Sequence, residues 1–323
     1  MIAATRPTQR PPDARLLVVA NDAATLPASL QGTHTRTGAP VEVRLAGRPS
    51  LKPEDVRRFS AVVFGAGDFR TRTEDRPAPP ALSPGDGLAL GPLRATVEGA
   101  LGHPRLVSLR FEGTPDEVWA GLAQHGRPVQ YAHVRTPLAL WDVWTRVAGP
   151  PVAFEPPSAG FALDWRALSA MRGRGVEFAT LTHAAGISST GDEELDRLLP
   201  FDEPYRIPEA TARAVRRAKS NGGRVVAVGT SVVRALEDAA AGDGLVRAGE
   251  RVATGRIGPA SRLRVVDAIL SGTHEPGTSH YELLRAFLDD ETLARTTAEL
   301  DARGYLTHEF GDSVLIERAR RVS

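Results

Sequence analysis

Short apolar runs separated by polar turns dominate the first third of the chain. Residues 15–20 are apolar and end at Asn21-Asp22, a pattern typical of a buried strand followed by a turn. Further short strands are predicted at residues 41–45, 60–65, 88–90, 94–97 and 106–111. Residues 68–87, rich in Pro, Gly, Arg and Asp, are predicted to form a loop between them. Short strands at this spacing predict a small antiparallel β-barrel or sandwich, which we place at residues 26–115.

After residue 114 the pattern changes to alternating helices and strands. Thr114-Pro115-Asp116-Glu117 predicts a helix that ends near Gln124, because a capping hydroxyl, a proline and acidic side chains favour the first turn. Further helices are predicted at residues 164–173, 208–220, 230–241, 279–288 and 290–303, and strands at residues 176–181, 225–228, 263–266 and 314–316. We therefore expect an α/β (α+β) fold, in which a larger αβ domain carries an inserted small antiparallel β-barrel domain. The expected division is 1–25 (leader and first strand of the αβ domain), 26–115 (inserted domain) and 116–323 (remaining αβ domain).

The composition is ordinary for a globular protein and excludes several kinds of site. Hydrophobic residues make up 41% and charged residues 24% of the 323 residues, and there is no cysteine. Disulfides, thiolate nucleophiles and cysteine metal sites are thereby excluded, and a reducing cytoplasm is the expected location. No stretch approaches the ~20 apolar residues of a membrane span, so no membrane partner is expected. Residues 1–12 lack the apolar core of a secretion signal and are interpreted as a flexible leader.

The formal net charge of +1 does not by itself indicate a nucleic-acid-binding protein. The basic residues are nearly all arginine, the exceptions being Lys52 and Lys219. Residues 205–264 nevertheless hold twelve Arg or Lys against five Asp or Glu. Two interpretations remain open for this region, a solvated helix face or a surface that contacts phosphates.

A strand–turn–helix pattern at residues 224–237 is the first candidate for a ligand site. A short buried strand is predicted to end at Gly229, after which Thr230 and Ser231 are expected to cap a helix. Free backbone N–H groups at such a helix start favour an anionic or polar ligand above the end of the strand. Many αβ proteins have such a turn for purely structural reasons, so this pattern alone is not specific.

Four other segments agree with this pattern in order and content. They are Ala20-Asn21-Asp22-Ala23-Ala24-Thr25, Pro157-Ser158-Ala159-Gly160-Phe161-Ala162-Leu163, Val265-Val266-Asp267 followed by Gly272-Thr273-His274-Glu275-Pro276, and Phe310-Gly311-Asp312. With Ala227 to Arg234, they resemble the motifs of the S-adenosylmethionine:tRNA ribosyltransferase-isomerases of the queuosine pathway. The resemblance covers roughly residues 14–317. It implies the same architecture, an αβ domain with an inserted β domain.

The chain also departs from the pattern of that family. Ala162 stands where the family has a histidine, and Gly272-Thr273 stand where it has Asn-Phe before the histidine. In a gapless alignment, the histidine of the family's Thr-Leu-His stretch is displaced by one place to His183. The family arginine of the first motif is Ala24. These differences indicate a divergent branch, for which the fold transfers better than the substrate.

The resemblance implies two catalytic residues, His274 and Glu203. His274 follows an apolar strand, in the kind of loop where αβ proteins bind ligands, and could orient a substrate or move a proton; the alternative is a surface loop histidine. Glu203 could attract a sulfonium cation or act as a general base; the alternative is an acid that suits a helix N-terminus. His280 and Tyr281, at a predicted helix start, are interpreted as packing residues.

The resemblance also implies the residues that bind S-adenosylmethionine, which is expected as co-substrate in residues 116–323. They are Ser158, Ala159, Gly160, Gly229, Thr230, Arg234 and Asp312. Arg234 could contact a carboxylate such as that of methionine, or it could form only a surface pair with Glu237. Asp312 could bond to a ribose hydroxyl, or it could cap a turn.

The expected function is transfer and isomerisation of the ribosyl moiety of S-adenosylmethionine onto 7-aminomethyl-7-deazaguanine in tRNA, which gives epoxyqueuosine. One alternative is a relative that uses the same donor with a small-molecule acceptor. Another is a tRNA-binding protein with degenerate catalytic residues. No redox cofactor is needed. No metal is expected, since His183 and His308 lack the spacing of metal ligands, and no dinucleotide or nucleoside-triphosphate motif is present.

Overall fold

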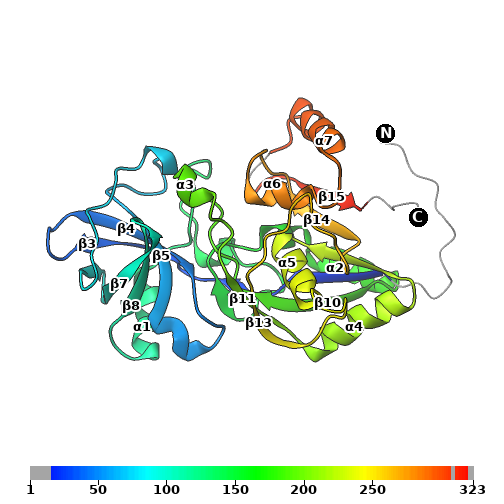
Figure 1. The fold of residues 1–323 in the computed structure, drawn as a ribbon, viewed down its shortest axis with the longest axis horizontal. Coiled ribbons are helices and arrows are strands. Elements are labelled where there is room, and N and C mark those ends of the chain that lie inside the picture. The colour runs from blue at the N-terminus through cyan, green and yellow to red at the C-terminus, as the bar shows by residue number, and fades with distance from the viewer. Residues whose placement is uncertain (1–15, 307–309, 319–323) are drawn as a thin grey trace.

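The computed structural model describes residues 16–306 and 310–318, so the leader predicted at residues 1–12 lies outside the described residues. A β-barrel lies at one end of an elongated molecule and an αβ domain at the other (Figure 1). The chain begins in the αβ domain, crosses to the barrel and then returns. This arrangement confirms the predicted fold class, whereas the exact domain boundaries stay predictions.

Six strands of the described chain close into the antiparallel barrel in the order β3-β4-β5-β8-β7-β6. They are β3 (Ser29–His34), β4 (Pro40–Gly47), β5 (Arg58–Phe64), β6 (Gly87–Leu90), β7 (Leu93–His103) and β8 (Leu106–Phe111). The polar strand β3 was missed by the sequence analysis. It closes the barrel against β6, where a Cβ on Gly32 would lie 2.1 Å from the carbonyl oxygen of Ala89. Only a glycine permits this approach of the two backbones.

Helix α1 (Pro115–His125) begins as predicted, with a complete capping box between Thr114 and Glu117. Its buried side chains Val118 and Leu122 join the hydrophobic core of the barrel, as does Phe154, which meets Phe59 edge-to-face. The barrel core is therefore completed by side chains that follow β8 in the sequence.

Seven strands of the described residues form the sheet of the αβ domain, in the order β13-β11-β10-β1-β12-β14-β15. They are β1 (Leu16–Asn21), β10 (Glu177–His183), β11 (Glu203–Ile207), β12 (Arg224–Val228), β13 (Gly249–Ala253), β14 (Ala268–Gly272) and β15 (Ser313–Glu317). The central strands β10, β1, β12 and β14 run parallel, and the outer strands are antiparallel to their neighbours. Strands β11 and β13 were not predicted. A small parallel pair, β2 (Ala24–Thr25) with β9 (Pro151–Ala153), lies where the chain leaves and re-enters the domain.

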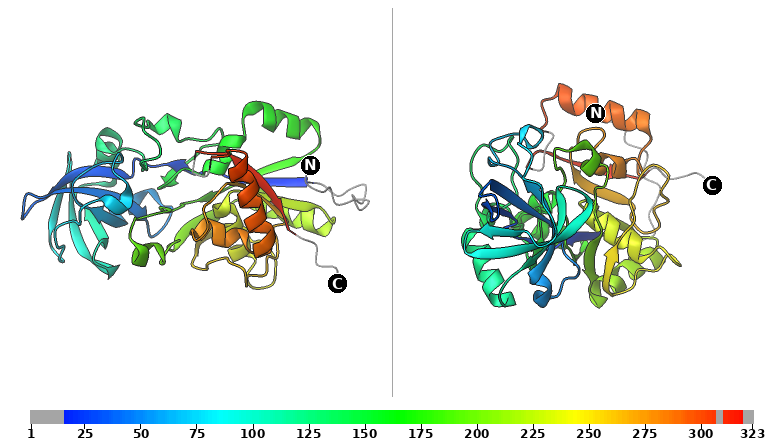
Figure 2. Two further views of the ribbon diagram at one scale, coloured as in Figure 1. Left: turned by 90° about the horizontal axis from the view of Figure 1, so that it is seen from above. Right: turned by 60° about the vertical axis from the view of Figure 1, so that its left-hand side comes forward.

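Alternation along the central strands divides the sheet into two faces. Leu17 and Val19 point to the core beneath α4 (Glu209–Ser220) and α5 (Thr230–Ala239). Val18 and Ala20 point to the opposite face, toward α2 (Trp165–Gly173) and the 3-10 helix η4 (Ser158–Ala162). Figure 2, left, shows α2 and α4 on the two sides of the sheet. Apolar side chains on both faces are what a parallel sheet covered by helices requires.

The strand predicted at residues 263–266 is wrong. Leu263, Val265 and Val266 are buried, but the N–H groups of residues 264–266 donate to the carboxylate of Glu237 at 2.7–3.0 Å. Because these N–H groups are already bonded, no strand forms there. The strand that pairs with β12 is instead β14, which begins at Ala268. The other late predictions are confirmed in α6 (Ser279–Leu284), shorter than expected, and α7 (Asp290–Ala302). None of the helices in the described residues is long and apolar enough to cross a membrane.

Candidate active site

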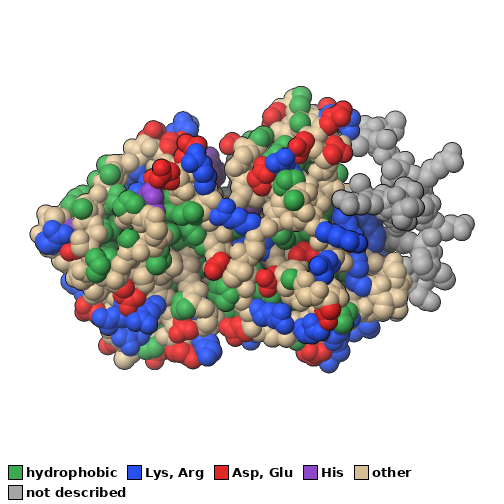
Figure 3. All heavy atoms as spheres, in the orientation of Figure 1, with side chains coloured by type: hydrophobic (Ala, Val, Ile, Leu, Met, Phe, Trp, Pro, Cys, Tyr) green, Lys and Arg blue, Asp and Glu red, His purple; other side chains and the backbone are tan. Residues whose placement is uncertain are grey.

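The carboxyl ends of the parallel strands face the barrel and gather the candidate residues at one edge (Figure 1). Asn21 ends β1, His183 ends β10, Gly229 follows β12 and Gly272 ends β14. The side chain of Asn21 clamps two of these strand ends, because its amide donates to the His183 carbonyl and its oxygen accepts the His183 N–H, both at 2.9 Å. Ligands of αβ sheets bind at such edges. The surface is notched where the two domains meet (Figure 3).

Glu203 and Arg234 form a buried ion pair at this edge, each only 5% exposed. The guanidinium also donates to the carbonyl oxygens of Ala253 at 3.0 Å, of Phe201 at 3.2 Å and of Gly255 at 3.3 Å. The other Glu203 oxygen accepts the Gly186 N–H at 2.5 Å. The guanidinium and both carboxylate oxygens of the pair are therefore bonded to groups of the protein itself.

Two alternatives raised from the sequence are wrong in light of this ion pair. Glu203 lies in β11 rather than at a helix N-terminus, and Arg234 does not form a surface pair with Glu237, since both are buried with other partners. Burial raises the pKa of Glu203, while the Arg234 charge and the Gly186 N–H oppose that rise. The ligand contact expected for Arg234 and the catalytic role expected for Glu203 stay predictions.

His183 lies beside this ion pair and is completely buried. Its Nε2 is 3.5 Å from a Glu203 oxygen, and its ring stacks on Tyr205 with centroids 6.2 Å apart. Neither ring nitrogen has a hydrogen-bond partner among the described residues. Burial, and then the Arg234 charge, lowers the pKa of His183 well below its usual value, so the imidazole is neutral. No role was predicted for this histidine from the sequence.

His274 lies in the loop after β14, as predicted, with its Nε2 3.0 Å from the Ser271 hydroxyl. It is only partly exposed, and its ring stacks on His280. Burial, with a contribution from His280, lowers the pKa of His274 to about 3. At neutral pH this imidazole is an uncharged hydrogen-bonding group. The alternative of an exposed surface histidine is wrong.

The predicted donor-binding segments lie together. Ala159 of η4 packs in one cluster with Val228 at the end of β12, and a Cβ on Gly229 would lie 3.6 Å from the Ala159 side chain. Gly229, with φ of 91°, is itself the N-cap of α5, so the expected capping by Thr230 and Ser231 is wrong. A left-handed backbone that favours glycine occupies the cap position. No side chain of the described residues caps this helix, and its first N–H groups open toward the edge.

Asp312 closes a turn beside this region. One carboxylate oxygen accepts the Leu306 N–H at 2.9 Å, and its carbonyl accepts the Thr273 N–H at 3.1 Å. Phe310 stacks on Phe161 of the η4 segment, with centroids 5.7 Å apart. The turn role considered for Asp312 is therefore present in the structure, and its ribose contact stays a prediction.

Glu155 is a further polar group that the sequence analysis missed. It follows β9, is buried, and accepts hydrogen bonds from the Tyr131 hydroxyl and from the Ser188 N–H at 3.0 Å. Its charge adds to the rise in the pKa of Glu203 and opposes the lowering of the pKa of His280. Glu155 thus acts on a carboxylate and an imidazole that belong to separate elements. Since they converge only through folding, no local sequence signal marks Glu155.

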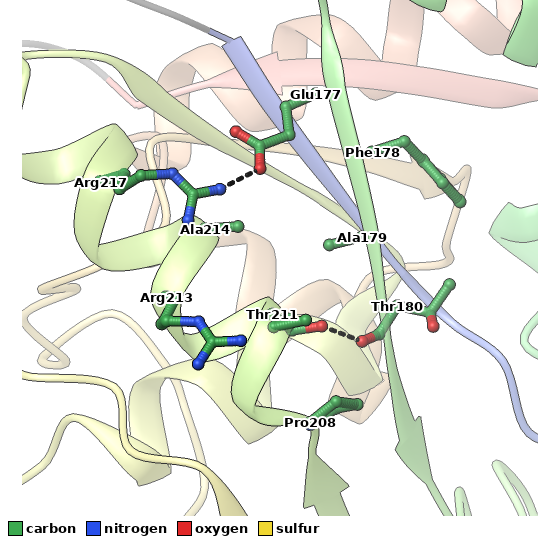
Figure 4. Close-up of a pocket in the computed structure, with 10 residues that line it drawn as sticks. Glu177, Phe178, Ala179, Thr180, Pro208, Thr211, Arg213, Ala214 and Arg217 are labelled. Atoms are coloured by element: carbon green, nitrogen blue, oxygen red, sulfur yellow. Dashed lines mark hydrogen bonds and ion pairs between the residues drawn. The ribbon is translucent and has the colours of Figure 1, made fainter.

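Two surface pockets of about 510 and 520 Å³ flank α4, away from this edge. The first lies between α4 and β10, where Arg217 is paired with Glu177 and Thr211 donates to the Thr180 carbonyl (Figure 4). Ion pairs also hold Arg216 to Glu209 and Lys219 to Asp267. These contacts agree with a solvated helix face for this part of the basic region.

Among residues 16–306 and 310–318, no group of three or more His, Asp or Glu side chains could hold a metal ion. His308 lies outside the described residues.

The fold combines an αβ sheet with a β-barrel, and the candidate site is the polar, histidine-containing edge of the sheet that faces the barrel. The chain belongs to the family described as queuosine biosynthesis protein, whose model matches residues 12–316. The resemblance inferred from the motifs is thereby confirmed.

Curated relatives carry the name S-adenosylmethionine:tRNA ribosyltransferase-isomerase. One from Citrifermentans bemidjiense is 35% identical over 313 residues, covering 93% of this chain and 84% of that protein. One from Thermus thermophilus is 36% identical over 251 residues, covering 75% and 71%. A solved S-adenosylmethionine tRNA ribosyltransferase from Thermotoga maritima is 22% identical, with a TM-score of 0.44, covering 94% of this chain and 83% of that chain. The relatives' names describe transferase-isomerases, and the expectation of an enzyme of this class is confirmed.

Proposed function

We propose that this protein transfers and isomerises the ribosyl moiety of S-adenosylmethionine onto 7-aminomethyl-7-deazaguanine in tRNA, giving epoxyqueuosine. Family membership over residues 12–316 supports the reaction class. One observation supports placing the active site at the carboxyl edge of the sheet: η4, the Gly229 cap and His274 converge there. Their segments are far apart in the sequence, and no requirement of packing alone explains so many polar groups there.

His274 is assigned the orientation of the donor rather than proton uptake. With a pKa of about 3, its imidazole stays neutral at working pH and offers one donor and one acceptor nitrogen. Nε2 is engaged with Ser271, which leaves Nδ1 as the contact for substrate. A weakly basic nitrogen is a poor acceptor for a proton next to a sulfonium, whose positive charge disfavours a second cation.

The donor itself is expected between η4 and the start of α5. The N–H groups at the α5 N-terminus suit the carboxylate of its methionine portion, and Thr230 adds a hydroxyl. Ser158, Ala159 and Gly160 supply a close, small-residue wall, and Asp312 the ribose contact. Arg234 and Glu203 keep their expected roles as ligand contact and catalytic carboxylate, and their ion pair also ties β11 to α5, which carries the Gly229 cap. No redox cofactor is involved.

The decisive experiment follows adenine release from S-adenosylmethionine by mass spectrometry. The three reactions contain tRNA bearing 7-aminomethyl-7-deazaguanine, the same tRNA with unmodified guanine, or no tRNA. Adenine that appears only with the modified tRNA supports the proposal, and a His274→Ala variant should then lose most of the turnover. Absence of adenine in all three reactions contradicts it.

A small-molecule acceptor is the second candidate, because ion pairs neutralise much of the basic region. Arg216, Arg217 and Lys219 are each paired with an acid, and the net charge is only +1. Binding of tRNA measured at rising salt separates the candidates, since each phosphate contact steepens the salt dependence. Donor binding in calorimetry without tRNA affinity at low salt favours a small acceptor. Steep salt dependence without turnover favours a degenerate tRNA-binding protein.

A further inference from the structure

His280, the second residue of α6, lies against His274. The two rings are stacked, with centroids 4.8 Å apart and planes 18° from parallel. Thr278 caps this helix, since its hydroxyl accepts the Tyr281 N–H at 3.2 Å. The position of the His280 ring is therefore set by the first turn of α6, and packing was the role expected for it from the sequence.

The remaining contacts of His274 come from its own strand and loop. Its Nε2 meets the Ser271 hydroxyl at 3.0 Å. A Cβ on Gly272 would lie 3.5 Å from Cε1 and 3.7 Å from Nε2, so the ring rests near the bare α-carbon of that glycine. Neither contact restrains the plane of the ring as a flat neighbour does. His280 is the aromatic neighbour from a separate element.

The charged and titratable groups that act on His280 come from three directions. His274 lies in the β14–α6 loop, Glu155 follows β9, and Arg234 is on α5. Burial lowers the pKa of His280, Glu155 opposes this and Arg234 adds to it. The imidazole of His280 is thus neutral at pH 7, and two uncharged rings stack without repulsion.

We propose that His280 is a positioning residue that holds the His274 imidazole in the plane in which Nε2 meets Ser271 and Nδ1 faces the substrate. It acts through His274 and does not touch the reacting atoms. The effect on catalysis rests on the proposed function, whereas the effect on the orientation of the His274 ring does not depend on it. The aromatic face, and not the ring nitrogens of His280, is the required feature.

The test compares His280→Ala, which removes the stack, with His280→Phe, which keeps a flat ring without nitrogens. Glu282→Ala, on the same short helix, is the matched control. We expect His280→Ala to lower kcat for adenine release about tenfold with KM for S-adenosylmethionine within twofold. His280→Phe should restore kcat to within twofold of the parent, and the control should match the parent.

A second measurement does not depend on turnover. In NMR spectra of the ring carbons and nitrogens, His274 should show one tautomer in the parent and in His280→Phe, and averaged signals in His280→Ala. If the proposed reaction is absent but these spectra behave so, the positioning role stands and the proposed function fails. Unchanged His274 signals in His280→Ala overturn the inference. So does a His280→Phe variant as impaired as His280→Ala, because the nitrogens would then be the required feature.

Discussion

The buried ion pair between Glu203 and Arg234 makes the strongest prediction about stability. In Arg234→Met, the apolar chain still fills space, but the Glu203 carboxylate loses its counter-charge while remaining 5% exposed. What remains is the Gly186 N–H at 2.5 Å and a neutral His183 at 3.5 Å. The carbonyl oxygens of Phe201, Ala253 and Gly255 lose a donor as well.

The magnitude follows from the burial of both partners. Removing one member of a buried pair costs about 3–5 kcal/mol, because an uncompensated charge stays in a medium of low polarity. Domains are stable by only about 5–15 kcal/mol, so Arg234→Met should bring the αβ domain close to unfolding. Glu203→Gln keeps an acceptor for Gly186 but leaves Arg234 unpaired, and should cost a similar amount. The double variant removes both charges and should cost at least ~2 kcal/mol less than the sum.

Urea unfolding, followed by circular dichroism and tryptophan fluorescence, measures each free energy of unfolding. Arg217→Met is the control, because the side chains of its pair with Glu177 are 57% and 28% exposed and such a pair is worth at most about 1 kcal/mol. An Arg234→Met variant destabilised by less than ~1 kcal/mol would refute the reasoning, as would strict additivity in the double variant. Retained stability with lost donor binding would instead place Arg234 in direct contact with the ligand.

Three further predictions concern the same edge and its supports. The pKa values of His183, His274 and His280 lie below the usual value, so the unfolded chain binds more protons than the folded one as pH falls below ~6.5. Stability should therefore fall toward acid. In urea titrations His183→Phe should reduce the slope of the free energy of unfolding against pH by ~0.7 kcal/mol per pH unit at pH 6.5 and by up to ~1.4 kcal/mol per pH unit at pH 5, and an unchanged slope would contradict this. Glu237→Ala should cost about 2–4 kcal/mol, because three N–H groups, two of them buried, lose their acceptor. Glu209→Ala, on the exposed face of α4, should cost under ~0.5 kcal/mol by the same assay. Gly186→Ala would place a Cβ 2.9 Å from the Ala46 carbonyl oxygen and 3.0 Å from a Glu203 oxygen, so its midpoint of urea unfolding should fall by the equivalent of about 1–3 kcal/mol. Gly173→Ala, with open space around it, should be neutral or slightly stabilising. Equal midpoints for the two variants would contradict the close contact at Gly186.

The sequence by itself determined the elements whose signals are local. The cap of α1 at Thr114, the short apolar run that predicts β8 and the apolar run of β1 each depend on neighbouring residues, and the structure confirms them. The ordered motifs were likewise enough to identify the family, and to point to His274 and the segment around Gly229. Such local patterns can be read from the sequence because hydrogen bonding and burial within one element follow from the spacing of its own residues.

Only the tertiary structure decided which polar groups meet. The strand expected at residues 263–266 does not form because a carboxylate from α5, distant in sequence, takes its N–H groups. The polar strand β3 forms because Gly32 lets β6 approach and close the barrel. Likewise, Arg234 forms an ion pair with Glu203 and not with Glu237, and the His280 ring stacks on the His274 ring. Both contacts join separate elements. The free energy of such contacts depends on burial and on distance in space, and neither quantity can be read from the spacing of residues along the chain.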